Sequence, residues 1–348
     1  MLTIRVPFGF SYEHEHFSEK EALENFRHLR SRLNEQLRKT KNILEVADAV
    51  AVQKNYPVLE SFYKDLNGEE IMTKNFRSEA HKATEEINKW VKEKTHDKIQ
   101  KLFGQDLDAS TAMVLLNAVF FKGVWKHRFN HTLTMREPFN YFGKGGVKRS
   151  EQVEMMNIRG TFGHAHFEDG DLLEVPFVND STVFLAFLPS EKHSADLSMM
   201  SSISALFGAS EESVNSVKFA DRLAHVRPHR EVKVHLPKFK IESKYSLNAA
   251  LKHLGLRDAF EQGHADFSRI NGKRDLVVSD VAHKAFFEVN EEGAEAAAAT
   301  GVVIVPTSVQ LPVTFNANRP FLFMIYDKEY QLVLFAGVVN KPWFRIKV

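Results

Sequence analysis

Apolar residues recur every three to four positions in two parts of the chain, a spacing that places them on one face of an α-helix. The first part begins at Ser18, a residue type that caps helices, with Glu21 three residues later. The second part covers residues 80–94. We therefore expect two amphipathic helices. Their apolar faces contain Leu23, Phe26, Leu29, Leu33 and Leu37 in the first helix and Ile87, Trp90 and Val91 in the second.

Other segments have the pattern of β-strands. Residues 42–53 alternate in the way of a largely buried strand. Residues 113–121 are apolar except for Asn117, which predicts a central strand covered on both faces and an asparagine that needs a partner. Since no repeat, linker or break in composition divides the chain, we expect an α+β fold in one domain over residues 1–348. Further β-rich runs occur at 182–188, 232–236, 276–281 and 332–339.

Composition and charge exclude several classes of function. The 348 residues are 43% hydrophobic, which suffices for a large buried core. A net charge of +1 gives no overall field that would attract nucleic acid or an anionic membrane, and no apolar run approaches the roughly 18 residues of a membrane-spanning helix. We therefore expect neither partner. The absence of cysteine excludes disulfides and cysteine nucleophiles but fits both a secreted and a cytoplasmic protein.

Sixteen histidines raise the alternative of a metal-dependent hydrolase. His164 and His166 would share one face of a strand, and His225 and His229 form a second cluster. Neither pair forms an HExxH pattern or has a nearby carboxylate placed in a recognisable ligand set. We therefore predict no metal, no cofactor and no enzymatic activity, and we keep the hydrolase only as a remote alternative.

Residues 291–308 read EEGAEAAAATGVVIVPTS, which fits neither an ordinary loop nor an ordinary strand. An alanine-rich surface helix is one interpretation, because alanine has the best helix propensity. However, the alanine block has only four residues, and β-branched residues and Pro306 follow it. With a period of two, one face is entirely small or apolar, as a strand that slides between two existing strands requires. This face contains Ala294, Ala296, Ala298, Thr300, Val302 and Ile304.

This stretch of glycine, glutamate and alanine resembles the hinge of the serpins. The resemblance extends along nearly all of the chain, through INKWV at 87–91, NAVFFKGVW at 117–125, HLPK at 235–238 and FNANRPFLF at 315–323. It implies the serpin fold, with mixed β-sheets, surrounding helices and an exposed reactive-centre loop within 291–308. The hinge would comprise Glu291, Gly293, Ala294, Glu295, Ala296, Ala297, Ala298, Ala299 and Thr300.

The resemblance implies a serine protease inhibitor that acts as a suicide substrate. In serpins the reactive bond lies at a fixed spacing after the hinge glycine, which gives Thr307–Ser308 here, with Val305 and Val309 as the nearest competing positions. The protease would form an acyl-enzyme, and residues 294–305 would insert into the central sheet. Because threonine would fill the primary pocket of the protease, we expect an elastase-like or subtilisin-like target.

The resemblance also assigns residues that control this insertion. Asn117 and His283 would be gating residues whose hydrogen bonds hold the sheet closed. Trp125, Lys238 and Glu291 would lie at the top of the sheet, beside the point where the loop enters. We expect the Lys238–Glu291 pair to be partly exposed and therefore to contribute little to stability.

Serpins normally begin with helices and a strand that would precede the first segment of this chain. We therefore expect that an N-terminal segment is missing, together with any signal peptide, and that the protein is extracellular, with a cytoplasmic location as the alternative. Asn130 and Asn179 begin glycosylation sequons that would be used in the secretory pathway. Two alternatives to inhibition are a non-inhibitory carrier or storage serpin and an inactive truncated form. The lack of a bulky or charged residue on the inserting face favours inhibition.

Basic residues on the first helix suggest a second partner. At 100° per residue they fall within a narrow sector that could bind a sulfated polysaccharide. The competing interpretation is a solvated surface, because glutamates, among them Glu21, Glu24 and Glu35, lie on the same helix. The basic residues are Arg27, Arg30, Arg38 and Lys41.

Overall fold

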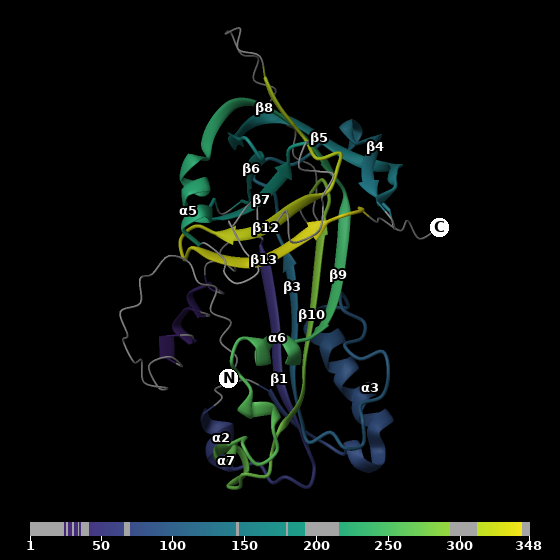
Figure 1. Cartoon of the computed structure of the whole chain (residues 1–348), viewed down its shortest axis with the longest axis vertical. Helices are drawn as coiled ribbons and strands as arrows, with labels where there is room; N and C mark the ends of the chain where they lie inside the picture. The colour runs from purple at the N-terminus through teal and green to yellow at the C-terminus, as the bar shows by residue number, and fades with distance from the viewer. Residues whose placement is uncertain are drawn as a thin grey trace. The chain divides into compact units, whose positions relative to one another are not determined.

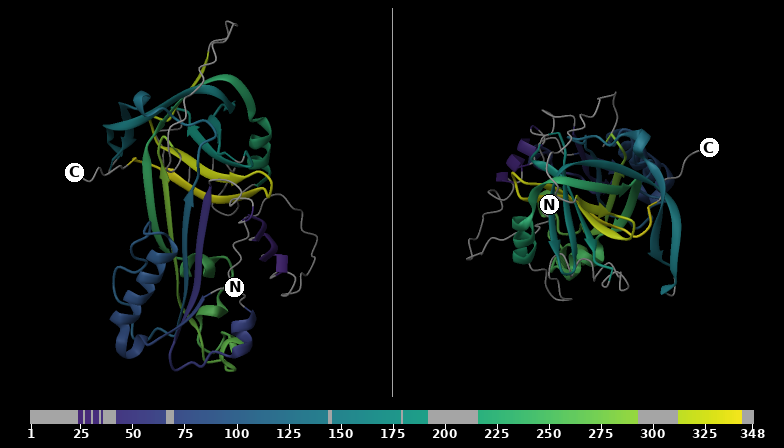
Figure 2. Two further views of the ribbon diagram at one scale, coloured as in Figure 1. Left: turned by 180° about the vertical axis from the view of Figure 1, so that it is seen from behind. Right: turned by 90° about the horizontal axis from the view of Figure 1, so that it is seen from above.

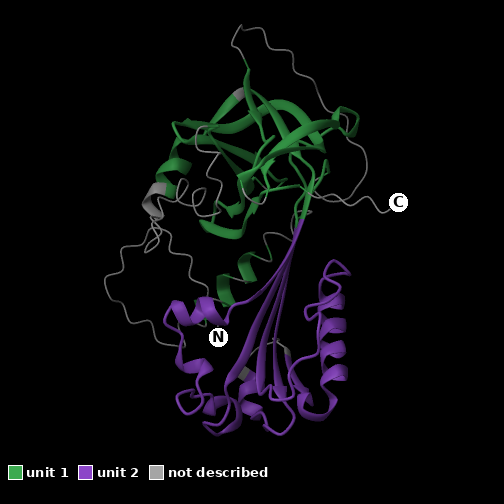
Figure 3. Cartoon of the chain, turned by 45° about the vertical axis from the view of Figure 1, so that its right-hand side comes forward, with its two compact units in different colours: residues 1–42, 122–240, 288–348 green, residues 43–121, 241–287 purple. Residues whose placement is uncertain are grey.

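Figure 1 shows the computed structural model of the chain. The structure describes residues 24, 25, 27–29, 31–33, 35, 42–65, 70–143, 146–178, 180–191, 216–292 and 312–342. Contacts divide the chain into two compact units (Figure 3). Unit 1 comprises residues 1–42, 122–240 and 288–348, and unit 2 comprises residues 43–121 and 241–287. Whether they form the single domain expected from the sequence stays a prediction.

The sheet of unit 2 has the strand order β2-β1-β3-β10-β9 among the described residues. Helix α3 lies along one side of it, whereas α2, α6 and α7 lie on the other (Figures 1 and 2). A short 3-10 helix, η4 (Asp258–Phe260), follows α6. The strands are β1 (Ile43–Gln53), β2 (Glu70–Lys74), β3 (Met113–Lys122), β9 (Phe239–Ser246) and β10 (Val278–Val289), and the helices are α2 (Glu60–Asp65), α3 (Phe76–Lys94), α6 (Asn248–His253) and α7 (Ser268–Asn271).

Helix α3 forms the core of unit 2 together with the sheet. Alternate residues of the central strands point toward the helix, and three of those from β1 are alanines, whose small side chains let the helix approach closely. The packed residues include Phe76, Ala83, Ile87 and Val91 of α3, Ala47, Ala49 and Ala51 of β1, Leu116, Ala118 and Phe120 of β3, and Ala282 and Phe286 of β10.

The start of α3 is fixed by two polar side chains. Gln53 Oε1 accepts a hydrogen bond from the N–H of Phe76 at 2.7 Å, and Asn75 Oδ1 accepts one from the N–H of Ser78 at 3.3 Å. Glu79 departs from helical geometry, with φ −135° and ψ 39°. The predicted helix over 80–94 is therefore confirmed, but an additional irregular turn precedes it.

Unit 1 contains an eight-stranded sheet among its described residues, in the order β11-β8-β5-β6-β7-β12-β13, with β4 paired to β5. Helix α5 (Ser216–His225) contributes Phe219 to the core formed with the buried side chains of β7 and β12. The strands are β4 (Met135–Phe142), β5 (Lys148–Phe167), β6 (Gly170–Pro176), β7 (Thr182–Pro189), β8 (Arg227–Pro237), β11 (Val313–Asn316), β12 (Phe321–Asp327) and β13 (Leu332–Val339), and η1 (His131–Leu133) is a short 3-10 helix.

The predicted strands are mostly confirmed. Those at 113–121, 182–188, 232–236 and 332–339 lie within observed strands, and the one at 42–53 matches β1 except that β1 begins at Ile43. The strand predicted at 276–281 is wrong in extent, since β10 begins at Val278 and continues to Val289. Full coverage of β3 on both faces is also wrong, because the residues facing away from α3, from Leu115 to Val119, are only half-buried.

The first predicted helix is described only at residues 24, 25, 27–29, 31–33 and 35, all of which are helical. Within this part Leu33 is buried, as its place on the apolar face predicts. No helix among the described residues is long and apolar enough to cross a membrane.

Candidate functional site

The first group of predicted residues lies in unit 2, where β3 and β10 pair in parallel. Asn117 and His283 are directly opposite each other in the register, and His283 Nδ1 lies 2.5 Å from Asn117 Oδ1. On the other side, Asn117 Nδ2 donates to Asp48 Oδ1 of β1 at 2.6 Å. The structure therefore brings the two predicted gating residues together and gives the strand asparagine its partner. We call Asn117 and His283 the gating pair.

The hydrogen bonds of the gating pair fix the protonation of His283. The Asp48 carboxylate can only accept, so the amide nitrogen of Asn117 faces it, and the amide oxygen is left to accept from the imidazole. His283 Nδ1 is therefore the protonated nitrogen. Burial lowers the pKa of His283 below its ordinary value, and the charge of Asp48 opposes this only in part. The ring stacks on that of Tyr245 from β9, with ring centres 6.4 Å apart.

The second group lies in unit 1, around the residues that follow β10. We call residues 290–292 the loop root. Trp125 is buried and stacks on Phe177 with ring centres 4.7 Å apart. Its indole Nε1 donates to the carbonyl of Asn290 at 2.8 Å, and its backbone N–H donates to the carbonyl of Glu292 at 3.4 Å. Trp125 thus holds the backbone of the loop root at two points, once through its side chain and once through its own backbone.

Glu291 is the centre of this second group. Its Oε1 accepts from the hydroxyl of Thr134 at 2.8 Å and lies 3.3 Å from Lys238 Nζ. The expected partial exposure of the Lys238–Glu291 pair is wrong, since the two side chains are only 15% and 2% exposed. Burial alone would raise the pKa of Glu291, but the hydrogen bond from Thr134 and the positive charge of Lys238 hold it below its ordinary value. The pair is therefore a buried ion pair with a hydrogen-bonded acid.

Sequence reasoning missed two residues of this group, both on the segment around η1. Thr134 donates to Glu291, and His131 faces both carboxylates of the loop root, with Nδ1 3.4 Å from Glu291 Oε2 and Nε2 3.6 Å from Glu292 Oε1. They lie about 160 positions before their partners, and their segment has no periodic pattern that would indicate the contact. The sequence indicated only a glycosylation sequon in this segment, at Asn130, whose Oδ1 accepts from the N–H of Thr132 at the start of η1.

Several predicted residues lie outside the described part of the chain. These are residues 293–308, with the remaining hinge residues and the reactive bond Thr307–Ser308, the sequon residue Asn179, and Arg30, Arg38 and Lys41 of the proposed polyanion site. The structure describes Arg27, which is helical, and Asn130, which is exposed at the start of η1.

The histidines of the alternative metal site have a carboxylate beside them. Asp171 Oδ1 lies 3.2 Å from His164 Nε2 and 2.9 Å from His166 Nδ1. Burial would raise the pKa of Asp171, but hydrogen bonds from the two histidines lower it. Within the described ranges, no three histidine, aspartate or glutamate side chains are arranged to hold a metal ion.

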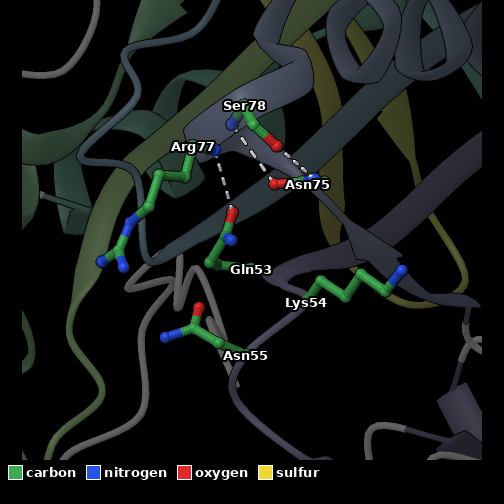
Figure 4. A pocket seen from close by; sticks show the side chains of 6 residues that line it. All are labelled: Gln53, Lys54, Asn55, Asn75, Arg77 and Ser78. Carbon is green, nitrogen blue, oxygen red and sulfur yellow. Dashed lines mark hydrogen bonds between the residues drawn. The ribbon is translucent and has the colours of Figure 1, made fainter.

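A surface pocket beside the start of α3 contains none of the predicted residues (Figure 4). Its polar side chains serve the helix, since Gln53 and Asn75 accept from backbone N–H groups and Asn75 Nδ2 donates to Ser78 Oγ at 2.6 Å. This arrangement explains the polar lining as a helix cap.

Comparisons with known proteins agree with the geometry. The family model described as serpin (serine protease inhibitor) matches residues 6–342. Iripin-2 of Ixodes ricinus is 40% identical over 306 residues, which cover 86% of this chain and 72% of that protein. Human Serpin B11 is 37% identical over 276 residues, which cover 78% and 66%.

Two solved structures share the fold. A complex of thyroxine-binding globulin with thyroxine has a TM-score of 0.77 and 28% identity, with 93% of this chain and 82% of that chain covered. Uncleaved ovalbumin has a TM-score of 0.76 and 29% identity, with 94% and 83% covered.

Proposed function

Because the chain belongs to the serpin family, we propose that it inhibits a serine protease as a suicide substrate. It is not an enzyme, since the family that its sequence matches is one of serine protease inhibitors. Cleavage would occur at Thr307–Ser308, and residues 294–305 would then insert as a strand between β3 and β10.

The main support for this proposal is that the segment after the loop root has the residue pattern of an inserting strand, while the two strands between which it would insert are paired with each other. The segment from Ala294 to Ile304 has one small or apolar face, as insertion requires. β3 and β10 are hydrogen-bonded to each other, and the gating pair joins them. An inserting strand would replace this parallel pairing and would break the bond between Asn117 and His283.

Elastase-like or subtilisin-like proteases are the proposed targets, because no lysine or arginine lies between Gly293 and Arg319 for a trypsin-like pocket. Incubation with such a protease should give a covalent complex that survives denaturing gel electrophoresis, and mass spectrometry should find the new end at Ser308. Cleavage only at other bonds, such as those after Val305 or Val309, would sink this assignment.

A substitution at the hinge separates inhibition from cleavage. Ala294→Arg should leave a loop that the protease cleaves but should abolish the covalent complex, because an unpaired guanidinium would be buried at the first step of insertion. The matched variant Glu295→Arg changes the opposite face and should keep most of the complex. Equal trapping by Ala294→Arg and the unchanged protein would show that the inserting face is assigned wrongly.

A non-inhibitory carrier is the alternative function. One structural neighbour, thyroxine-binding globulin, was solved as a complex with thyroxine. The small residues of the inserting face favour inhibition here. Cleavage by every protease tested without any covalent complex, together with no rise in thermal stability after cleavage, would favour the carrier.

We further propose that the protein acts outside the cell and contacts sulfated polysaccharides through Arg27, Arg30, Arg38 and Lys41. Exposed Asn130 in an Asn-His-Thr triplet supports passage through the secretory pathway. A loss of mass after enzymatic removal of N-glycans would test this.

If the polyanion proposal holds, replacement of Arg27 and Arg30 by alanine should lower the salt concentration at which the protein elutes from heparin resin. An unchanged elution point would leave that helix a merely solvated surface.

A further inference from the structure

The strongest observation outside the assigned roles is the contact between η1 and the loop root. The backbone N–H of Phe129 donates to the carbonyl of Glu291 at 3.0 Å, which brings the two segments together. The next side chains along the chain then face the two carboxylates, with His131 between Glu291 and Glu292. One imidazole thus lies within 3.6 Å of two acids, one on each ring nitrogen.

The acid nearest to His131 has an oxygen that needs a donor. Glu291 Oε1 is served by Thr134 and Lys238, but its Oε2 is buried and has no hydrogen-bond partner. A buried acceptor without a donor is costly, and the imidazole at 3.4 Å is in position to supply one. A neutral imidazole has a single N–H and can donate to only one of the two acids, whereas an imidazolium can donate to both.

The charged groups around His131 are mainly acidic. Glu291 and Glu292 face it directly, and Lys238 of the segment after β8 lies between Glu291 and Glu154 of β5, at 3.3 and 3.7 Å. This group therefore contains three carboxylates, those of Glu291, Glu292 and Glu154, and one ammonium group. Further along, Glu137 of β4 has its own histidine, His235 of β8, at 3.4 Å. A second positive charge at His131 would offset part of the excess negative charge.

We propose that His131 is a positioning residue that ties the loop root to η1, and that protonation strengthens the tie by adding a second charge-assisted hydrogen bond. Histidine side chains exchange this proton between pH 5 and 8. In acid the loop root would be held more firmly in its present arrangement. If the proposed inhibitory function holds, the start of strand insertion, directly after Glu292, would then be slower.

Trp125 offers a test that does not depend on inhibition, because it bonds to Asn290 and to Glu292. With Trp90→Phe and Trp343→Phe, it is the single tryptophan of the chain. Its emission should shift between pH 8 and pH 5. His131→Gln should remove this shift, and the matched variant His235→Gln should keep it. A shift that survives His131→Gln, or that both variants remove equally, would overturn the proposal.

Because replacement of two tryptophans can disturb folding, a second test measures amide hydrogen exchange in proteins that keep all their tryptophans. At pH 5.5, peptides covering residues 288–292 should exchange faster in His131→Gln than in the unchanged protein, by about twofold, the size expected when one member of an ion pair is exposed. At pH 8 the difference should vanish. Equal exchange of the two proteins at pH 5.5 would contradict the proposal.

The consequence for inhibition is measured as the number of inhibitor molecules consumed for each protease molecule trapped. Between pH 8 and pH 6 this number should rise in the unchanged protein. The rise should be about twofold larger than in His131→Gln, because slower insertion gives the acyl-enzyme more time to be hydrolysed. A protein that traps no protease would remove the proposed function but leave the fluorescence and exchange results to decide the role of His131. Equal pH dependence of trapping in the two proteins would overturn the link to insertion.

Discussion

The gating pair of unit 2 and the loop root of unit 1 both contain a histidine, but the two histidines face opposite surroundings. His283 donates to a neutral amide and is largely buried, and this burial lowers its pKa. His131 is 62% exposed and faces two carboxylates. The surroundings of His283 therefore favour a neutral imidazole, whereas those of His131 offer acceptors for both N–H groups of an imidazolium.

The comparison gives opposite responses to acid. A histidine whose pKa is lowered in the folded protein binds its proton less tightly than in the unfolded chain, so its contribution to stability is present above about pH 6.5 and is lost as the pH falls below it. At the loop root, protonation of His131 adds a bond. Falling pH should therefore loosen the gating pair and tighten the loop root.

The largest effect is expected from Glu291→Gln, which removes the carboxylate 3.3 Å from the Lys238 ammonium group and leaves only that of Glu154, at 3.7 Å. Breaking a buried pair in this way costs about 3 kcal/mol, which urea unfolding would measure. Lys238→Met should cost a similar amount, and the double variant should cost less than the two single variants together. Simple additivity would mean that the pair is not coupled and that the loop root resembles an ordinary surface.

Asn117→Leu is expected to have the second largest effect. It removes the donor to Asp48 and the acceptor for His283, so two partly buried hydrogen bonds are lost at a cost of about 2 kcal/mol in the free energy of unfolding. The matched control is Asn55→Leu, at an exposed asparagine, which should change the stability by less than about 0.5 kcal/mol. Similar losses in both variants would contradict a structural role of the gating pair.

A smaller effect is expected from pH. Between pH 6.5 and 5.5 the unchanged protein should lose at most about 1.4 kcal/mol through His283, and His283→Gln should flatten this slope. Unfolding curves at several pH values would measure it. A slope that is unchanged in the variant would show that His283 is not the group responsible.

The smallest effect is expected from Thr134→Val, which removes one of the donors to Glu291 Oε1 while Lys238 remains. The loss should be about 1 kcal/mol in unfolding experiments. It should grow toward the value for Glu291→Gln if Lys238→Met is introduced as well. No loss at all would mean that the hydroxyl contributes nothing to holding the acid.

The sequence predicted the fold well where periodicity and burial agree. The strand at 332–339 was found with its observed bounds, and the serpin fold inferred from the resemblance is confirmed. The twenty-residue strand β5 was missed because polar residues and two glycines, Gly160 and Gly163, interrupt its alternation. β10 was cut short because His283 and Lys284 interrupt its apolar pattern.

The candidate site was predicted only in part. The resemblance identified Asn117, His283, Trp125, Lys238 and Glu291, which the structure brings together in two groups. His131 and Thr134 could not be predicted, because contacts across about 160 positions depend on tertiary packing and leave no local pattern. The burial of the Lys238–Glu291 pair was misjudged for the same reason.

The register between β3 and β10 also bears on how the chain folds. Asn117 and His283 are 166 positions apart, so closing this parallel pair requires a very long loop and a large loss of chain entropy. The hairpin of β12 and β13 joins neighbouring segments and should form much earlier. During synthesis, therefore, we expect β3 to have unpaired main-chain N–H and C=O groups along one edge until β10 has been made and pairs with it. Such an edge can pair with another copy of the chain, so slow closure makes aggregation the main competitor of correct folding.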